Sequence, residues 1–210
     1  MPTTTTTPPP RTPQANFFAS NTFFHPYRIA LYLSLASITA LFLGTTGAYV
    51  FTRLNVAGFK PIHLPLVFVL NTLILLGSSA TLHWANACYH RDDTRNYQRA
   101  LAYTLGLTLL FVVMQYVGWS MLDLRSHPPT GKAYIYAISI LHVIHIVGGL
   151  PFFVLFLVTA VRRMREPVSV LIYFSDPAKR LKLELLTTYW HFLDVLWIYL
   201  VVFFTLNAIF

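Results

Sequence analysis

Five long apolar runs dominate the sequence and restrict what the chain can fold into. They occupy residues of about 29–52, 64–89, 101–121, 133–161 and 185–210. Each run reaches the roughly 20 residues that a helix needs to cross the hydrocarbon layer of a membrane. Helices are expected because lipid offers no partner for unpaired backbone groups, and a membrane β-barrel would show short alternating segments instead. The sequence therefore predicts an all-α membrane protein with a bundle of five transmembrane helices.

Composition supports the membrane class and argues against a disulfide or thiolate metal site and against a nucleic-acid partner. Only 10% of the 210 residues are charged, whereas about a quarter are charged in a soluble domain. The single cysteine, Cys88, allows neither an internal disulfide nor a thiolate metal cage. The net charge of +8 does not indicate a nucleic-acid partner, because the basic residues lie in short loops between apolar runs, where membrane topology explains them.

The chain divides into a tail and a membrane domain. Residues 1–24, beginning MPTTTTTPPPRTPQ, are rich in Thr and Pro and are expected to form a flexible tail without a cleaved signal peptide. Residues 25–210 form the transmembrane domain. Its longest loop is expected between Arg162 and Glu184, at the inner surface of the membrane.

The basic residues divide unevenly between the two ends of the expected bundle. On one side are Arg11, Arg28, Arg91, Arg95, Arg99, Arg162, Arg163, Arg165, Lys179, Arg180 and Lys182, and on the other are Arg53, Lys60, Arg125 and Lys132. Positive residues concentrate on the cytoplasmic side of membrane proteins. The sequence therefore predicts the N-terminus inside and the C-terminus outside.

Ionisable residues within the apolar runs are few and need partners. His142 and His145 share one helix face, as do His191 and Asp194, because each pair is separated by three positions. We expect these faces to meet, with Asp194 and Glu184 as carboxylate partners for the imidazoles of the fourth run. This arrangement would be a structural polar seam of His142, His145, Glu184, His191 and Asp194.

Two other interpretations of these residues stay open. Two histidines and an aspartate could hold a metal or a haem. Intramembrane Asp and His chains can also carry protons or ions. A hydrogen-bonded seam is favoured, because paired polar residues on an apolar helix more often satisfy their neighbours. No catalytic, cofactor-binding or metal-binding residue is assigned in this chain.

Other side chains have simpler explanations. Asn71, Thr72, Ser78 and Ser79 are expected to make polar contacts between helices. Aromatic residues near the ends of the runs indicate an interfacial belt. The candidate lipid or interface residues are Trp84, Trp119, Tyr189 and Trp190.

Four motifs, in order along the chain, resemble one family. They are LPLVFVLNTLILLGSSATLHWA, QRALAYTLGLTLLFVVMQYVGW, LHVIHIVGG and ELLTTYWHFLDVLWIYL. The last resembles a signature of Glu, then Tyr-Trp-His-Phe, then Asp, at Glu184, 189–192 and Asp194. Together they resemble subunit III of the haem–copper terminal oxidases, the cytochrome c oxidase family, in its shorter five-helix bacterial form.

The resemblance implies a non-catalytic subunit of a proton-pumping respiratory oxidase in the inner (plasma) membrane of a bacterium. Haem and copper would lie in partner subunits, and this chain would pack against catalytic subunit I, with subunit II in the same complex. It would bind phospholipid and support proton-coupled oxygen reduction in aerobic electron transport. A larger respiratory supercomplex is a further candidate partner.

Two positions depart from the family pattern. A buried glutamate is usual at the position of Ile38, and a second acidic residue is often found near Gly118. Two further hypotheses stay open. One is subunit III of a quinol oxidase, which differs in its electron donor. The other is an independent transporter, which would need an inverted repeat or interrupted helices.

Overall fold

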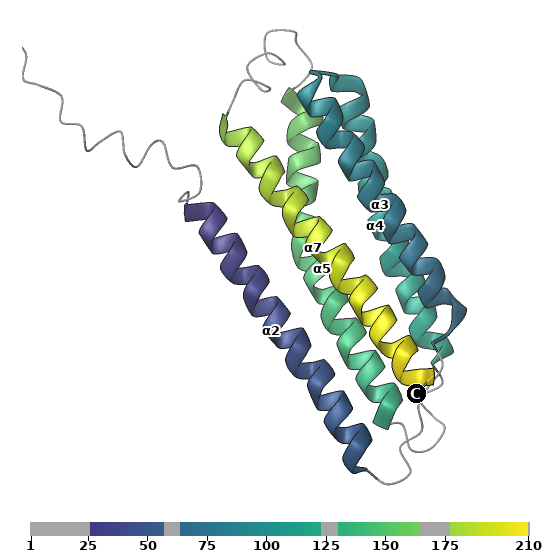
Figure 1. Cartoon of the computed structure of the whole chain (residues 1–210). Coiled ribbons are helices and arrows are strands. Elements are labelled where there is room, and N and C mark those ends of the chain that lie inside the picture. Colours follow the sequence, from purple (N-terminus) through teal and green to yellow (C-terminus); the bar gives the residue numbers. More distant parts are fainter. Residues whose placement is uncertain (1–25, 57–63, 123–129, 164–176, 210) are drawn as a thin grey trace, which may run out of the picture.

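The computed structural model describes residues 26–56, 64–122, 130–163 and 177–209, and over these ranges it is helical, with no strand. The helices are α2 (Pro26–Asn55), α3 (Leu66–His90), α4 (Thr94–Met121), α5 (Thr130–Arg163) and α7 (Pro177–Ile209). All five are long and apolar enough to cross a membrane (Figure 1). The predicted fold class and number of spans are confirmed. The expected tail, residues 1–24, lies outside the described residues.

Two helices, α4 and α7, begin seven and eight residues earlier than the apolar runs. α4 begins at Thr94 rather than near residue 101, because the side chain of Asp93 caps it and accepts a hydrogen bond from the backbone N–H of Asn96. α7 begins at Pro177 rather than near residue 185, and proline is favoured in the first turn of a helix. The expected loop from Arg162 to Glu184 is therefore partly helical. Both added segments are polar, so hydropathy alone did not include them.

The helices pack as a tight pair beside a looser group. α3 and α4 form an antiparallel hairpin joined by Arg91, Asp92 and Asp93, and they share the most extensive contact in the bundle. α7 contacts α3, α5 and α2, so it joins the two parts (Figure 1). α2 packs on α5 and α7. The odd number of spans places Pro26 and Ile209 at opposite ends.

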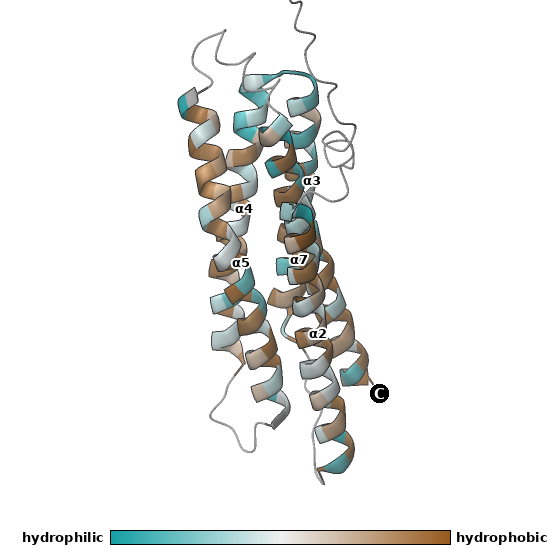
Figure 2. Cartoon of the chain, turned by 90° about the vertical axis from the view of Figure 1, so that its left-hand side faces the viewer, coloured by the Kyte–Doolittle hydropathy of each residue, from teal (hydrophilic) through white to brown (hydrophobic). Residues whose placement is uncertain are grey.

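Two clusters of aromatic and aliphatic side chains form the core. In the larger one, Trp197 stacks on Phe68 with ring centroids 6.0 Å apart and meets the ring of Phe111 edge-on at 5.1 Å. In the other, Trp190 packs against Phe153 at 4.9 Å. Most of the outer surface is also apolar, with hydrophilic residues gathered near the α3–α4 connection (Figure 2). An apolar exterior is what a lipid-embedded bundle requires.

Candidate functional site

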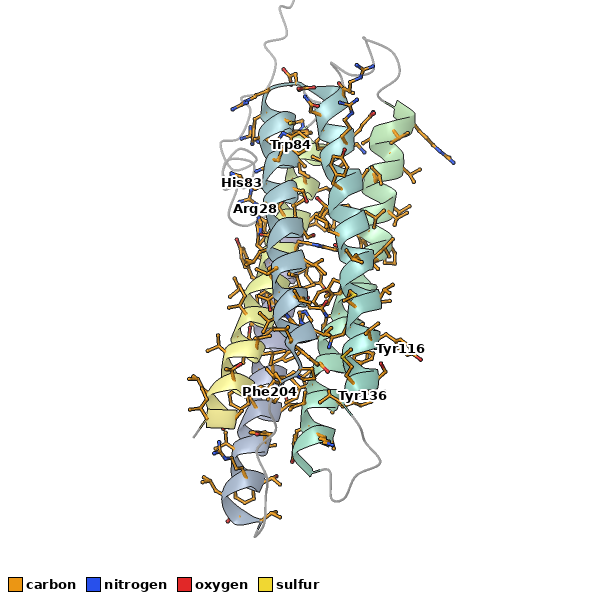
Figure 3. The ribbon with its side chains drawn as sticks, turned by 90° about the vertical axis from the view of Figure 1, so that its right-hand side faces the viewer. Arg28, His83, Trp84, Tyr116, Tyr136 and Phe204 are labelled. Atoms are coloured by element: carbon orange, nitrogen blue, oxygen red, sulfur yellow. The ribbon has the colours of Figure 1, made fainter. Side chains whose placement is uncertain are left out.

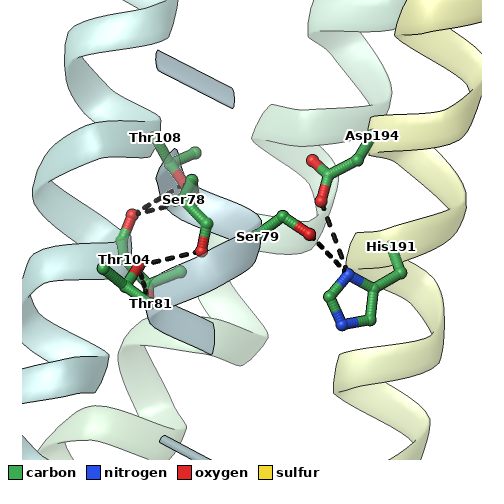
Figure 4. A network of polar contacts seen from close by, with 7 residues as sticks. All are labelled: Ser78, Ser79, Thr81, Thr104, Thr108, His191 and Asp194. Atoms are coloured by element: carbon green, nitrogen blue, oxygen red, sulfur yellow. Dashed lines mark hydrogen bonds and ion pairs between the residues drawn. The ribbon is translucent and has the colours of Figure 1, made fainter. Parts of the chain in front are cut away.

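A polar contact joins α3 to α7 near the middle of both helices. Ser79 Oγ lies 2.8 Å from His191 Nδ1, and the same nitrogen lies 3.6 Å from Asp194 Oδ2 (Figure 4). Asp194 is 5% exposed, whereas 36% of the His191 side chain is exposed. The two residues that share a face of α7 therefore meet each other, and Ser79 supplies the bond between helices.

Further polar contacts between helices agree with the sequence-based hypothesis for Asn71 and Thr72. The side-chain amide of Asn71 donates to Gln115 Oε1 over 2.8 Å, and both residues are fully buried. The indole N–H of Trp197 donates to Thr72 Oγ1 over 3.1 Å. These bonds join α3 to α4 and α3 to α7, so the prediction of interhelical contacts is confirmed.

A hydroxyl cluster lies between α3 and α4 beside this contact. Ser78 Oγ is 3.3 Å from Thr108 Oγ1, and Thr81 Oγ1 is 2.8 Å from Thr104 Oγ1 (Figure 4). The hydroxyls of Thr104 and Thr108 also donate to backbone carbonyl oxygens four residues earlier. The cluster holds polar atoms on both helices of the hairpin in hydrogen-bonding range.

His142 lies in an aromatic cage rather than beside a carboxylate. The side chain is fully buried, and its ring centroid lies 5.1 Å from that of Trp197, 6.1 Å from Phe111 and 6.4 Å from Phe42. Neither ring nitrogen has a hydrogen-bond partner among the described residues. The expected pairing of this imidazole with Asp194 or Glu184 is therefore not formed.

His145 takes part in the α5–α7 contact through its backbone. Its Nδ1 donates to the carbonyl oxygen of Leu141 over 2.7 Å, within α5. Its own carbonyl oxygen accepts a 2.8 Å hydrogen bond from the hydroxyl of Tyr189 on α7. The two helices approach closely here, since a Cβ on Gly149 would lie only 2.7 Å from Tyr189 Cε1 and 3.0 Å from Trp190 Cζ3. Glycine permits this approach.

Glu184 pairs with an arginine rather than with an imidazole. Its Oε2 forms an ion pair with the guanidinium of Arg28 on α2. This contact joins the first turn of α2 to α7, and it was not expected from the sequence. The structural polar seam therefore divides into three places: the Ser79–His191–Asp194 contact, the α5 face of His142 and His145, and the Arg28–Glu184 pair.

The four candidate interface aromatics lie in different surroundings. Trp84 is 40% exposed, near the end of the bundle that holds the α3–α4 connection (Figure 3), and stacks on Tyr103. Trp119 is half-buried and donates its indole N–H to Ser139 Oγ over 2.8 Å. Trp190 is 3% exposed, so it is a core residue, and Tyr189 is half-buried. The early start of α7 places both well inside that helix rather than at its end.

The two positions at which the sequence departs from the resembled pattern have apolar surroundings. Ile38 is half-buried and packs against the larger core cluster. Gly118 is buried, and a Cβ there would lie 3.2 Å from a ring carbon of Phe68. A longer side chain at residue 118 would therefore require this part of the α3–α4 contact to move.

A groove opens between α2, α5 and the first half of α7. Its volume is about 1350 Å³. Four cations lie along it, Arg28, Lys179, Arg180 and Lys182, and its walls include the apolar side chains of Leu31, Phe152, Leu155 and Phe156. We call this the basic groove. Sequence reasoning missed it, although the three cations in the first turns of α7 and the two glycines of α5 were visible.

The described residues contain no group of three or more His, Cys, Asp or Glu side chains placed to hold a metal ion. His142 and His145 are on one helix face, and Asp194 pairs with His191 on another helix. The geometry therefore offers hydrogen-bonding and packing contacts between helices, together with a groove that combines cations with apolar walls.

Comparison with known proteins gives a consistent match. A family model described as "Cytochrome c oxidase subunit III" matches residues 16–208. A cytochrome c oxidase subunit 3 from the bacterium Synechocystis is 27% identical over 80% of this chain and 70% of its own length. The cytochrome c oxidase subunit 3 of Cyanidium caldarium is 28% identical over 69% of this chain. A protein from Rickettsia felis, described as "Probable cytochrome c oxidase subunit 3", is 27% identical over 69% of this chain. The chain spans about half the length of these last two relatives.

Proposed function

Because the chain belongs to the cytochrome c oxidase subunit III family, we propose that it is the non-catalytic subunit III of a haem–copper respiratory oxidase. The match over residues 16–208 carries this proposal. In this role the chain packs against catalytic subunit I and stabilises it, in a complex that also contains subunit II. Haem and copper reside in those partners, where oxygen is reduced and protons are moved. This chain contributes no catalytic residue.

One face of the bundle carries exposed polar side chains that favour contact with a partner subunit rather than with lipid alone. His191 and Ser79 lie near the middle of α7 and α3, and 36% of the His191 side chain is exposed outside the bundle. His83, one turn along α3 from Ser79, is exposed as well. Hydrocarbon cannot hydrogen-bond an imidazole, and ionisable groups at this depth almost always face protein or water. We therefore place the contact with subunit I along the α3–α7 face.

The basic groove supports the binding of a phospholipid. Cationic pockets between membrane helices bind anionic lipid headgroups on the cytoplasmic side. Lys179, Arg180 and Lys182 lie in the first turns of α7, where they can contact a phosphate, and Phe152 and Leu155 of α5 supply an apolar wall for the acyl chains. The Arg28–Glu184 pair at the groove holds α2 against α7. The lipid would thus fill the space that α2 leaves beside α5 and α7.

The proposed location is the plasma membrane of a bacterium, with the N-terminal end of α2 inside. Relatives in Synechocystis and Rickettsia support the bacterial assignment. The distribution of charge supports the orientation, because the α3–α4 connection and the start of α7 lie at the same end of the bundle (Figure 1), and six of the eleven described Lys and Arg residues lie at this end, in the connection, the first turns of α4 and the first turns of α7.

Purification through this chain in a mild detergent tests the proposal. We expect haem-bearing and copper-bearing subunits to co-elute and to give a reduced-minus-oxidised haem spectrum, with the metals bound to those partners. Cells that carry the untagged chain are the control. Elution without a haem subunit, or redox metal bound by this chain itself, would refute the assignment. The identity of the co-eluting subunit II, with or without a dinuclear copper domain, distinguishes cytochrome c from quinol as the electron donor.

A further inference from the structure

A small cavity lies inside the bundle and is lined by side chains of α3, α4, α5 and α7. Its volume is about 10 Å³, and Ser78, Thr108 and Asp194 line one part of it. The rest of the lining is largely apolar and includes Leu75, Phe111 and Leu193. A space of roughly 10–15 Å³ on this measure accommodates one water molecule, provided that polar partners surround it.

The polar atoms at this cavity have unused hydrogen-bonding capacity. Asp194 is 5% exposed, and its Oδ2 is buried without a hydrogen bond, with the His191 ring nitrogen 3.6 Å away. Ser78 Oγ has contacts of 3.3 Å and 3.5 Å with oxygen atoms of Thr108 and Thr104, whereas hydroxyl hydrogen bonds are usually about 2.7–2.8 Å long. Thr108 donates its proton to the carbonyl oxygen of Thr104 over 2.9 Å, which leaves its own oxygen free to accept.

We propose that this cavity is a binding site for one water molecule that bridges Asp194 to the α3–α4 hydroxyl cluster. The water donates to the Asp194 carboxylate and to Thr108 Oγ1, and it accepts from the hydroxyl of Ser78. Three hydrogen bonds are typical for a buried water. A buried carboxylate oxygen without a bond is costly, so a space of the right size that is lined by the Asp194 side chain favours a bound water over a dry void.

The bound water would complete a polar chain across three helices. On one side it reaches Asp194, His191 and Ser79, and on the other it reaches Ser78 and Thr108 (Figure 4). α7 is thereby fastened to both helices of the α3–α4 hairpin at mid-membrane depth. Every side chain that lines the cavity belongs to this chain and is buried, so the site does not depend on any partner subunit.

Water-edited solid-state NMR of the full chain in lipid bilayers tests the site. Thr46 is the internal standard, because its hydroxyl is buried and bonded to Phe42 and Tyr199 but does not line the cavity. We expect magnetisation to pass from water to Ser78 and Thr108 several-fold faster than to Thr46. Equal rates at the three residues in the folded wild-type chain would overturn the proposal.

A pair of variants gives a second reading of the same site. Ser78→Ala combined with Thr108→Val removes two of the three partners of the water, so transfer to residues at the cavity should fall to the Thr46 level. Thr46→Val is the matched control and should leave transfer to Ser78 unchanged. Undiminished transfer in the folded double variant would also overturn the proposal. If the double variant does not fold, the comparison of transfer rates to Ser78, Thr108 and Thr46 in the wild-type chain still tests the proposal.

Discussion

The hydroxyl of Tyr189 on α7 donates to the backbone carbonyl oxygen of His145 on α5, 2.8 Å away, and the edge of the same ring covers Gly149. This contact fixes how closely the two helices approach, because no side-chain atom of α5 stands between the ring and the backbone. The contact depends on one glycine and not on its neighbour, since a Cβ on Gly148 would meet nothing within 4 Å.

The adjacent glycines therefore predict opposite outcomes. Gly149→Ala should lower the free energy of unfolding by about 1–3 kcal/mol, because the rings of Tyr189 and Trp190 must move aside. Gly148→Ala should leave it unchanged or raise it slightly, since alanine favours helix. Thermal unfolding of both variants in the same detergent makes the comparison. Equal melting temperatures would show that the two helices are not held at this distance.

Asp194 is predicted to matter for assembly more than for chemistry. Asp194→Ala removes the carboxylate beside His191, so the half-buried imidazole loses its ion-pair partner, at a cost of about 0.5–1.5 kcal/mol. The amount of assembled complex in membranes should fall, while oxygen consumption per assembled complex stays near the wild-type value. Asp194→Asn keeps the shape and a hydrogen-bonding group, so it should assemble better than the alanine variant. Normal assembly of Asp194→Ala with immediate loss of turnover would instead indicate a role in proton transfer.

His142 and His191 should respond differently to the same replacement. His142→Leu removes a buried imidazole that bonds to no described residue, so the free energy of unfolding should stay level or rise by up to roughly 2 kcal/mol. His191→Leu breaks the contact with Ser79 and Asp194 and should lower it. Thermal unfolding measures both. Strong destabilisation by His142→Leu would mean that this imidazole has a partner, as a seam shared with α7 would require.

The cap of α4 predicts a dependence on pH at the membrane surface. The backbone N–H and the side-chain amide of Asn96 both donate to Asp93, and these bonds hold the pKa of its carboxyl below the ordinary value of 3.8. A lowered pKa in the folded state means that the stabilisation is complete above pH 3.8 and is lost as the pH falls through the folded pKa. Asp93→Ala should therefore be less stable than wild type at pH 7, and the difference should shrink below about pH 4.

Unfolding measured at several pH values between 7 and 3 tests this expectation. Asp92→Asn is the matched control, because it removes the same charge from the neighbouring residue while leaving the cap intact. It should reproduce the pH dependence of the wild type. A constant difference between Asp93→Ala and wild type across this range would show that the ionised carboxylate is not what caps the helix.

The basic groove predicts a change in bound lipid. Replacing Lys179, Arg180 and Lys182 with Gln removes three cations of the groove, so less anionic phospholipid should co-purify. The control replaces Arg91, Arg95 and Arg99 with Gln, three cations at the same end of the bundle but outside the groove. Lipid mass spectrometry on both preparations provides the measurement. Equal loss from the two variants would indicate general attraction to the membrane surface rather than a site.

The sequence predicted the five spans because length and hydropathy alone decide which segments can enter lipid. It placed the starts of α4 and α7 too late, since the polar turns at Thr94 and Pro177 lie outside the hydrophobic pattern. A polar turn capped by Asp93 is helical for local reasons that hydropathy does not measure.

The pairing of the buried polar residues was predicted less well. Three-residue spacing placed His191 and Asp194 on one face, and they do meet. The same spacing could not reveal how each helix is rotated about its axis. That rotation directs His142 toward Phe42, Phe111 and Trp197 and Glu184 toward Arg28. The Ser79–His191 bond joins residues 112 positions apart, and no local pattern in the sequence indicates it.

The three-residue link between α3 and α4 has a consequence for biosynthesis. So short a connection leaves the two spans little freedom to separate, and their long shared contact gives each a partner as soon as both have been translated. Arg91, Arg95 and Arg99 lie in or just after the link and resist translocation. The nascent chain should therefore release these two spans from the insertion machinery together, as a preformed hairpin that α5 and α7 join later.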